Sequence, residues 1–251
     1  MTGSPWLPLG TCPDADIRLV CLPHAGAGAS AFRLWGKGID AQIGVCPVQP
    51  PGREKRRKEA PFTSVEPLVR ELVSEISESV AEPYALFGHS TGALCAFQAV
   101  RELRDTGGPM PVHLFVSGRR APHMPLERDD LAAMSLPELA EFLQNLGGTP
   151  EGVLADHDIL GALRPLLAAD FAVNQGYDFI PAAPLDIPVT AFAGVEDTGA
   201  DGELMAPWKE HTTCDFTLHE LDGGHFAVFD RGAQVHAHIA AHLSTYLRPT
   251  A

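Results

Sequence analysis

The five residues Gly88-His89-Ser90-Thr91-Gly92 match the pattern G-x-S-x-G, in which a serine occupies a sharp turn between a strand and a helix. Small residues must flank the serine because the turn is tight, and its hydroxyl projects out of the sheet. The pattern also arises by chance as a structural glycine-rich turn. Here, however, residues 84–87 are predicted as a buried strand and residues 93–97 as the start of a helix. We therefore predict that Ser90 is a catalytic nucleophile.

A serine hydroxyl needs a base, and His225 is the best placed of the 11 histidines. It stands in Gly223-Gly224-His225-Phe226, directly after the last predicted strand. His89 adjoins Ser90, but neighbouring side chains in a tight turn diverge. The histidines of the predicted last helix are expected to be surface or packing residues: His236, His238 and His242. The sequence therefore predicts His225 as the general base.

A carboxylate must hold the tautomer of this histidine, and Asp197 is the predicted residue. In this type of site the chain order is serine, acid, histidine. Asp197 follows the strand predicted at residues 189–193, so it belongs at the carboxyl end of that strand. Asp222 is close to His225 in sequence but is expected to face away in the same loop. The full set of competing carboxylates is Glu196, Asp201 and Asp222.

The oxyanion that forms during acyl transfer needs two backbone donors. One is expected to be the N–H of Thr91, the residue after the nucleophile. We expect the other to be the N–H of Ala25, in the small-residue loop 23–28. His24 and Gly26 of this loop are predicted to contact the substrate. A nucleotide site is the alternative for such a loop, but the GxGxxG spacing and the Walker lysine are missing.

Short apolar runs alternate with helical patterns along the chain, which predicts a mostly parallel sheet with helices on its faces. The predicted strands are residues 17–22, 44–48, 84–87, 112–117, 189–193 and 216–221. Apolar residues at helical spacing predict a helix over 65–80, with Thr63 and Glu66 as a capping box before it. Further helices are expected over 93–103 and 233–246.

The stretch from about residue 122 to 184 interrupts this alternation with helical patterns alone. Ser135 and Glu138 stand at capping-box spacing before one helix, and Gly147 would end it. A second helical pattern runs from Leu160 to Phe171. We interpret the insertion as a lid over the active face, within a single domain spanning residues 1–251. The alternative is that it merely covers the sheet.

Composition restricts the class of protein. The chain has 251 residues, 45% hydrophobic, with a formal net charge of −14, which disfavours nucleic acid and anionic membranes as partners. No apolar run is long enough to span a membrane, and residues 1–11 do not resemble a signal peptide, so a cytoplasmic location is expected. The five cysteines are scattered, no metal-ligand spacing is present, and a monomer is the default expectation. Three are expected in the core: Cys21, Cys46 and Cys95.

Several motifs together resemble the type II (editing) thioesterases, and they cover the chain from about residue 17 to 246. They are Leu22-Pro23-His24-Ala25-Gly26 with Phe32 and Trp35, Pro51-Gly52-Arg53-Glu54, Gly88-His89-Ser90-Thr91-Gly92-Ala93, Ser117-Gly118-Arg119 with Ala121-Pro122, 194–197 and Gly223-Gly224-His225-Phe226. The resemblance implies an α/β-hydrolase fold without cofactor or metal. It also implies hydrolysis of acyl groups from the phosphopantetheine arm of a carrier protein in polyketide or nonribosomal peptide synthesis. Thr91 stands where the family commonly has methionine, which makes the pocket wall smaller and more polar.

Two alternatives share this scaffold, a general carboxylesterase and a chain-releasing thioesterase. A non-catalytic binding protein of the same fold is a third, although it would have no need of Ser90, Asp197 and His225 together. The basic run 53–58 is either a solvated loop or, with Arg119 and Arg120, an attraction for an acidic carrier protein.

Overall fold

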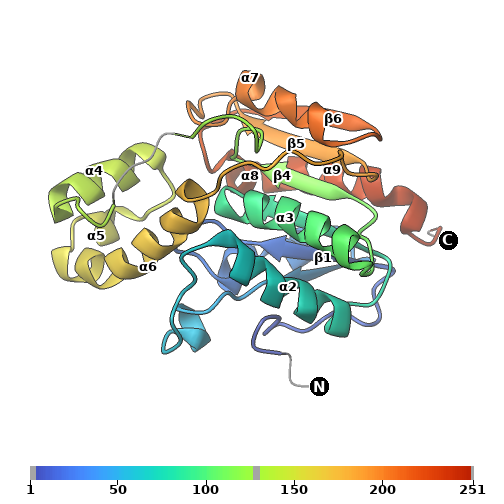
Figure 1. Cartoon of the computed structure of the whole chain (residues 1–251), viewed down its shortest axis with the longest axis horizontal. Helices are drawn as coiled ribbons and strands as arrows, with labels where there is room; N and C mark the ends of the chain where they lie inside the picture. Colours follow the sequence, from blue (N-terminus) through green and yellow to red (C-terminus); the bar gives the residue numbers. More distant parts are fainter. Residues whose placement is uncertain (1–3, 127–130, 250–251) are drawn as a thin grey trace.

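The computed structural model describes residues 4–126 and 131–249. Its centre is a sheet of six parallel strands in the order β2-β1-β3-β4-β5-β6 (Figure 1). The strands are β1 Ile17–Leu22, β2 Ile43–Pro47, β3 Tyr84–His89, β4 Leu114–Ser117, β5 Val189–Gly194 and β6 Phe216–Leu221. All six lie where the sequence predicts them, and their ends differ by at most two residues. The predicted parallel α/β architecture is thereby confirmed.

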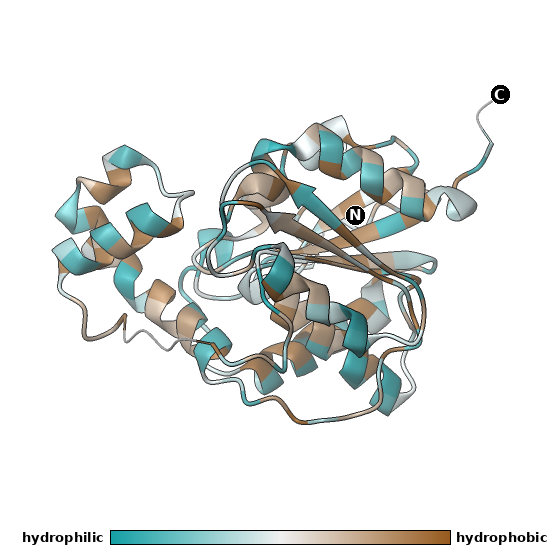
Figure 2. Ribbon diagram, turned by 90° about the horizontal axis from the view of Figure 1, so that it is seen from above, coloured by the Kyte–Doolittle hydropathy of each residue, from teal (hydrophilic) through white to brown (hydrophobic). Residues whose placement is uncertain are grey.

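Helices cover both faces of the sheet. Helices α2 (Val65–Ser79) and α3 (Thr91–Thr106) pack on one face, where their apolar residues join the larger core. Helices α1 (Trp35–Gly38) and α9 (Gly232–Leu243) pack on the other, with Phe87 and Phe115 of the strands. Figure 2 shows strands that are mostly hydrophobic between helices that carry both hydrophobic and hydrophilic residues. Parallel strands are buried on both faces, which is why they appear in the sequence as continuous apolar runs.

The predicted capping box before α2 is wrong. The helix begins at Val65 with Ser64 as its N-cap, and no side chain accepts a hydrogen bond there. Thr63 therefore lies one position too early, and Glu66 is the second helical residue rather than the third. The helix is stabilised instead by the apolar residues that it buries against the core: Val65, Leu68, Val69, Leu72, Val73 and Ile76.

The insertion between β4 and β5 forms a helical unit of its own. It comprises α4 (Leu136–Leu146), α5 (Glu151–Leu154) and α6 (His157–Gln175), while residues 127–130 lie outside the described part. The capping box of Ser135 and Glu138 is confirmed, and Gly147 ends α4 as predicted. The three helices share a small core that includes Leu139 and Leu160. Both views show α4 and α5 beyond the end of the sheet, not over its face (Figures 1 and 2).

Short helices complete the chain: α7 Gly202–Met205, α8 Ala227–Asp230, and the 3-10 turns η1 Ala29–Phe32, η2 Glu54–Arg56, η3 Ala206–His211 and η4 Ser244–Tyr246. The predicted last helix is therefore α9 followed by η4. Cys21, Cys46 and Cys95 are buried, as expected. None of the helices in the described ranges has the length and hydropathy that crossing a membrane requires.

Candidate active site

Ser90 occupies a strained turn between β3 and α3. Its φ of 56° and ψ of −119° lie in a region that residues with side chains rarely adopt. The two flanking glycines make the turn possible. A Cβ on Gly88 would collide with the backbone of Gly92, and a Cβ on Gly92 would collide with the carbonyl of Leu22. The amide of Ser90 donates a hydrogen bond of 2.8 Å to the carbonyl of Ser117, which fixes the turn against β4.

His225 and Asp197 meet at the ends of neighbouring strands. The distance from His225 Nδ1 to Asp197 Oδ2 is 2.8 Å. Asp197 is only 6% exposed, and its second oxygen accepts a hydrogen bond of 3.0 Å from the amide of Gly199. Burial alone would raise the pKa of Asp197, but the hydrogen bond and charge of His225 and the backbone donors outweigh it and leave the pKa lowered. The carboxylate therefore remains ionised and can orient the imidazole.

Ser90 and His225 line the same two cavities, so the structure brings the predicted nucleophile and base to one site. Within the described residues, no hydrogen bond joins the two side chains. Such bonds are often loose in enzymes without substrate. Gly118 lets His225 approach, because a Cβ there would lie 3.1 Å from His225 Cε1 and 2.5 Å from His89 Cε1. The φ of +60° at Gly118 favours glycine as well.

His89 and His24 form an aromatic layer beneath His225. His89 is fully buried, and its Nδ1 lies 2.7 Å from the hydroxyl of Ser117, so it points away from the Ser90 side chain. Burial holds the pKa of His89 well below its usual range. Burial, with the nearby charges of His225 and Arg53, lowers the pKa of His24 to about 4. Both rings are therefore neutral at pH 7 and act as packing groups.

The two predicted oxyanion donors, Thr91 and Ala25, border one small cavity together. Thr91 begins α3, where amides have no partner inside the helix, and Ala25 lines a cavity with Ser90. In the described part of the chain, neither amide donates a hydrogen bond to another residue. Gly26 is different, because its amide donates a hydrogen bond of 2.7 Å to Asp170 Oδ2. The Gly26 amide is therefore not free to donate to a substrate, although both Gly26 and His24 line the cavity that contains Ser90.

Two cavities of different character meet at Ser90 and His225. The smaller, of about 210 Å³, lies against the helical insertion and is mainly apolar; its lining includes Leu143, Val153, Leu163, Leu167 and Phe171. The larger, of about 570 Å³, is more polar and includes Arg120, Asn145, Asn174, Gln175, Glu196 and Asp230. The arrangement suits a substrate with an apolar end, a reactive carbonyl and a long polar end. Among the described residues, no group of three His, Cys, Asp or Glu side chains is arranged to hold a metal ion.

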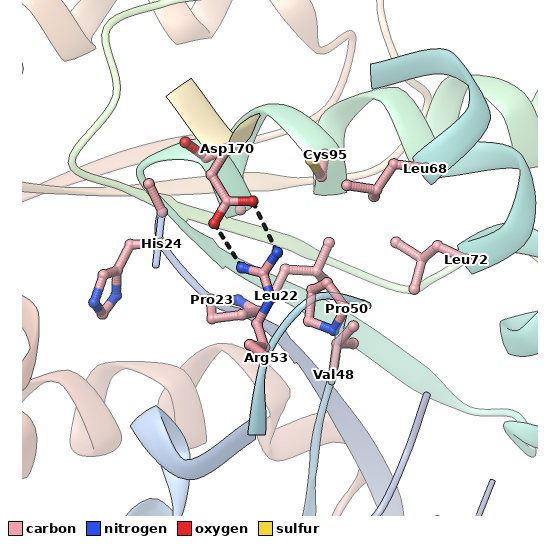
Figure 3. Close-up of a pocket in the computed structure, with 13 residues that line it drawn as sticks. Leu22, Pro23, His24, Val48, Pro50, Arg53, Leu68, Leu72, Cys95 and Asp170 are labelled. Atoms are coloured by element: carbon pink, nitrogen blue, oxygen red, sulfur yellow. Dashed lines mark hydrogen bonds and ion pairs between the residues drawn. The ribbon is translucent and has the colours of Figure 1, made fainter. Parts of the chain in front are cut away.

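The sequence analysis did not identify Asp170 of α6 as part of this region. Asp170 is 5% exposed and pairs with Arg53 through two short contacts, of 2.6 and 2.8 Å (Figure 3). One signal in the sequence could have identified it. Asp170 is an acidic residue beside Phe171, within a predicted helix whose apolar positions are otherwise mostly leucines. A charge on the apolar face of a helix has to find a partner.

The basic run 53–58 is only partly available for a partner protein. Arg53 is buried, and Arg56 pairs with Glu59 at 2.6 Å while its guanidinium lies over the ring of Trp6. Arg119 is also buried, at 5% exposure. Arg53 and Arg119 therefore cannot contribute to an exposed basic surface, and Arg56 is engaged within the fold. The exposed cations of the run are Lys55, Arg57 and Lys58.

Comparison with known proteins finds relatives that match nearly the whole chain. The thioesterase domain family matches residues 17–243. The gramicidin S biosynthesis protein GrsT of Aneurinibacillus migulanus is 37% identical over 235 residues, which cover 94% of this chain and 92% of GrsT. The thioesterase RedJ from the prodiginine pathway of Streptomyces coelicolor is 39% identical with a TM-score of 0.84, covering 93% of this chain and 86% of RedJ. BorB, the type II thioesterase from the borrelidin biosynthetic cluster, is 31% identical with a TM-score of 0.87, and the match covers 97% of this chain and 99% of BorB.

Proposed function

Because the chain belongs to the thioesterase domain family, we propose that it is a type II thioesterase that removes acyl groups from carrier proteins of polyketide or nonribosomal peptide synthesis. The observation that carries this proposal is the pairing of Asp197 with His225 at 2.8 Å, in a site where His225 and Ser90 border the same cavities. A serine, a histidine and a carboxylate in these positions are sufficient for acyl transfer to water.

In the proposed reaction, Ser90 Oγ attacks the thioester carbonyl while His225 accepts its proton. The amides of Thr91 and Ala25 stabilise the tetrahedral oxyanion. When it collapses, the carbon–sulfur bond breaks and His225 donates the proton to the departing sulfur, which leaves an acyl-Ser90 ester and a free thiol. Water, deprotonated by His225, then attacks the ester and releases the carboxylic acid and the Ser90 hydroxyl. The net change is thioester plus water to acid plus thiol.

The two cavities fit the two halves of an acyl-phosphopantetheine substrate. In this proposal the apolar cavity of about 210 Å³ holds the acyl group, and the insertion α4–α6 acts as its lid within a single catalytic domain. The more polar cavity holds the pantetheine arm, whose amides need hydrogen-bonding partners. The arm is then anchored to the carrier protein at the surface.

An editing role follows from the same resemblance. Type II thioesterases restart an assembly line by clearing stalled or misprimed acyl groups, and similarity to BorB along the chain favours this role over a chain-releasing one. The partner would then be an acyl or peptidyl carrier protein. Lys55, Arg57 and Lys58 offer exposed positive charge for its acidic surface on a protein whose own net charge is −14.

Comparison of matched substrates tests the function. Purified protein is incubated with propionyl-carrier protein, with the propionyl thioester of N-acetylcysteamine, and with a propionyl oxygen ester of similar size. The proposal predicts that kcat/KM is highest for the carrier-bound thioester. A higher value for the oxygen ester would instead indicate a general carboxylesterase, and no turnover of any of the three would contradict a hydrolytic function for short acyl groups.

A further inference from the structure

A buried ion pair joins the helical insertion to the loop after β2, and both of its members are hydrogen-bonded to the loop that carries Ala25. Asp170 lies on α6, and Arg53 lies in the loop after β2, 117 residues away in sequence. Arg53 contacts both carboxylate oxygens, at 2.6 and 2.8 Å, and the two residues are 6% and 5% exposed (Figure 3). This two-point geometry fixes the orientation of the carboxylate as well as its position.

The pair is hydrogen-bonded to the backbone at two points, the Ala25–Gly26 peptide and the carbonyl that follows it at Ala27. The amide of Gly26 donates to Asp170 Oδ2 at 2.7 Å, and Arg53 donates to the carbonyl of Ala27 at 3.1 Å. Arg53 itself is held by two hydrogen bonds to the carbonyl of Pro51, of 3.1 and 3.0 Å. One carboxylate from α6 thus anchors the loop one residue after the proposed oxyanion donor.

Within the loop itself, one backbone hydrogen bond spans Ala25 and Gly26, from the amide of Ala27 to the carbonyl of His24 at 3.2 Å. A cavity of about 30 Å³ borders Pro23, His24, Ala25 and Thr91 on the side where Arg53 and Asp170 lie. A cavity of this size has room for a water molecule, which needs about 10–15 Å³. Gly26 has a φ of +77°, which glycine adopts easily and which the loop must hold without help from a side chain. The hydrogen bond to Asp170 adds a restraint from outside the loop to that of the turn.

We propose that Asp170 is a positioning residue for the oxyanion hole, held by Arg53 and acting through the amide of Gly26. The inference rests on the proposed function, in which the Ala25 amide is one of the two donors. The Gly26 and Ala25 amides flank a single Cα, so anchoring one directs the other. Oxyanion stabilisation depends on donors that are fixed before the reaction.

The arrangement also makes the oxyanion hole depend on the docking of α6. Besides Asp170, the helix places Leu167 against Gly26, where Leu167 Cδ2 would lie 2.7 Å from an added Cβ. A displacement of α6 therefore removes the restraint from the Ala25–Gly26 peptide. In this proposal the Ala25 amide is held in position only when α6 is docked against the loop. Hydrolysis is therefore slower while α6 is displaced and the cavity is open.

The test compares Asp170→Asn and Asp170→Ala with Asp158→Asn. Asp158 is an exposed residue in the first turn of the same helix and provides a matched control. For each variant we would measure kcat and KM with a propionyl N-acetylcysteamine thioester, the melting temperature, and the affinity for an alkyl boronic acid. The boronic acid forms a tetrahedral adduct with the nucleophile, so it reports on the oxyanion hole without turnover.

Removal of a whole oxyanion donor lowers kcat by roughly 100- to 1,000-fold. A misdirected donor should cost less, so we expect a fall in kcat of about 10- to 100-fold for Asp170→Ala, with KM changed less than about threefold. Boronic acid affinity should fall by a similar factor. Asp170→Asn retains an acceptor for Gly26 and should keep more activity than Asp170→Ala, and Asp158→Asn should match wild type.

Three results would overturn the inference. One is full kcat and boronic acid affinity in folded Asp170→Ala protein; another is a defect confined to KM. The third is a loss of activity no larger than the loss of folded protein in the same samples. Failure of the proposed function is distinguishable, because Ser90→Ala would then hydrolyse the thioester as fast as wild type.

Discussion

The imidazole of His225 and the carboxylate of Asp197 are joined by a 2.8 Å contact across the ends of β6 and β5. The contact fixes the tautomer, because an ionised carboxylate can only accept a hydrogen bond and so requires the proton on Nδ1. Nε2 is then left as the acceptor for the Ser90 proton. The orientation of the base is thus determined by a residue that need not contact substrate.

Asp197→Asn should therefore disable the base while leaving the fold intact. An amide can offer an N–H to Nδ1, which favours the wrong tautomer, and the corresponding change in a serine protease lowers kcat about 10⁴-fold. We expect a fall of about 10²- to 10⁴-fold here, measured as kcat with a small acyl thioester. Glu203→Gln, at an exposed position of α7 away from both cavities, is the control and should retain wild-type kcat. Equal losses in both variants would contradict the assignment of Asp197.

Narrowing the apolar cavity should shorten the range of acyl groups accepted. Leu163 lines it from α6, so Leu163→Trp removes space from this cavity. Each excluded methylene should cost about tenfold or more in kcat/KM, with acetyl thioesters least affected. The measurement is kcat/KM across thioesters from acetyl to octanoyl. Ile159→Trp, at an exposed position of the same helix, should leave the series unchanged; an equal loss at every chain length in Leu163→Trp would rule out an acyl chamber here.

Charge reversal in the basic loop should weaken carrier recognition selectively. With Lys55, Arg57 and Lys58 changed to Glu, we expect KM for acyl-carrier protein to rise about three- to tenfold at low ionic strength, and less at high salt. KM for the small thioester should not change. A matched reversal elsewhere on the exposed surface should affect neither substrate: Arg33, Lys37 and Arg70. Equal effects on carrier-bound and small substrates would show that this loop does not dock the carrier.

The buried His113 should make stability depend on pH. Burial, with the neighbouring charge of His242, lowers the pKa of His113 to about 3, and its Nε2 lies 2.8 Å from the hydroxyl of Thr190. Because the folded pKa is below the unfolded value of about 6.5, the unfolded chain binds a proton that the folded chain does not. His113 therefore costs no stability above about pH 7, and its unfavourable effect grows as the pH falls from about 6.5 toward 3.

His113→Gln tests this dependence. Between pH 6 and 4, its free energy of unfolding should fall less steeply than that of wild type, by roughly 1.4 kcal/mol per pH unit, the limit for one proton. Urea denaturation at several pH values measures the two slopes. His157→Gln removes an exposed histidine of α6 and should preserve the wild-type slope. Identical slopes for His113→Gln and wild type would show that His113 is protonated equally in both states.

The sequence predicts the sheet well because strands buried on both faces must be continuously apolar, as in Tyr84–His89. The turn at Ser90 is predictable for a related reason, since only glycine fits beside it at Gly88 and Gly92. The prediction of a capping box at Thr63 is wrong because the helix has Ser64, one residue later, as its N-cap. The apolar residues that it buries are the same for either start.

Long-range polar pairing was not predictable in the same way. Nothing in the local sequence distinguishes Arg53, which is buried against Asp170, from the exposed Arg57 four residues later. The partner of Arg53 is 117 residues away, and only the packing of α6 brings the two together. Only three cations of the run 53–58 are therefore exposed: Lys55, Arg57 and Lys58. Arg53, the first residue of the run, is instead buried beside the active site, where it pairs with Asp170.

The central claim, that Ser90 is the nucleophile of a thioesterase, is tested most directly by intact-protein mass spectrometry of a propionylated carrier protein. The carrier is incubated with wild type, with Ser90→Ala, or with Ser74→Ala, which changes an exposed serine of α2. We predict that wild type and Ser74→Ala convert the carrier to its free thiol form, whereas Ser90→Ala leaves the propionyl group in place. Removal of the group by Ser90→Ala at the wild-type rate would contradict the account.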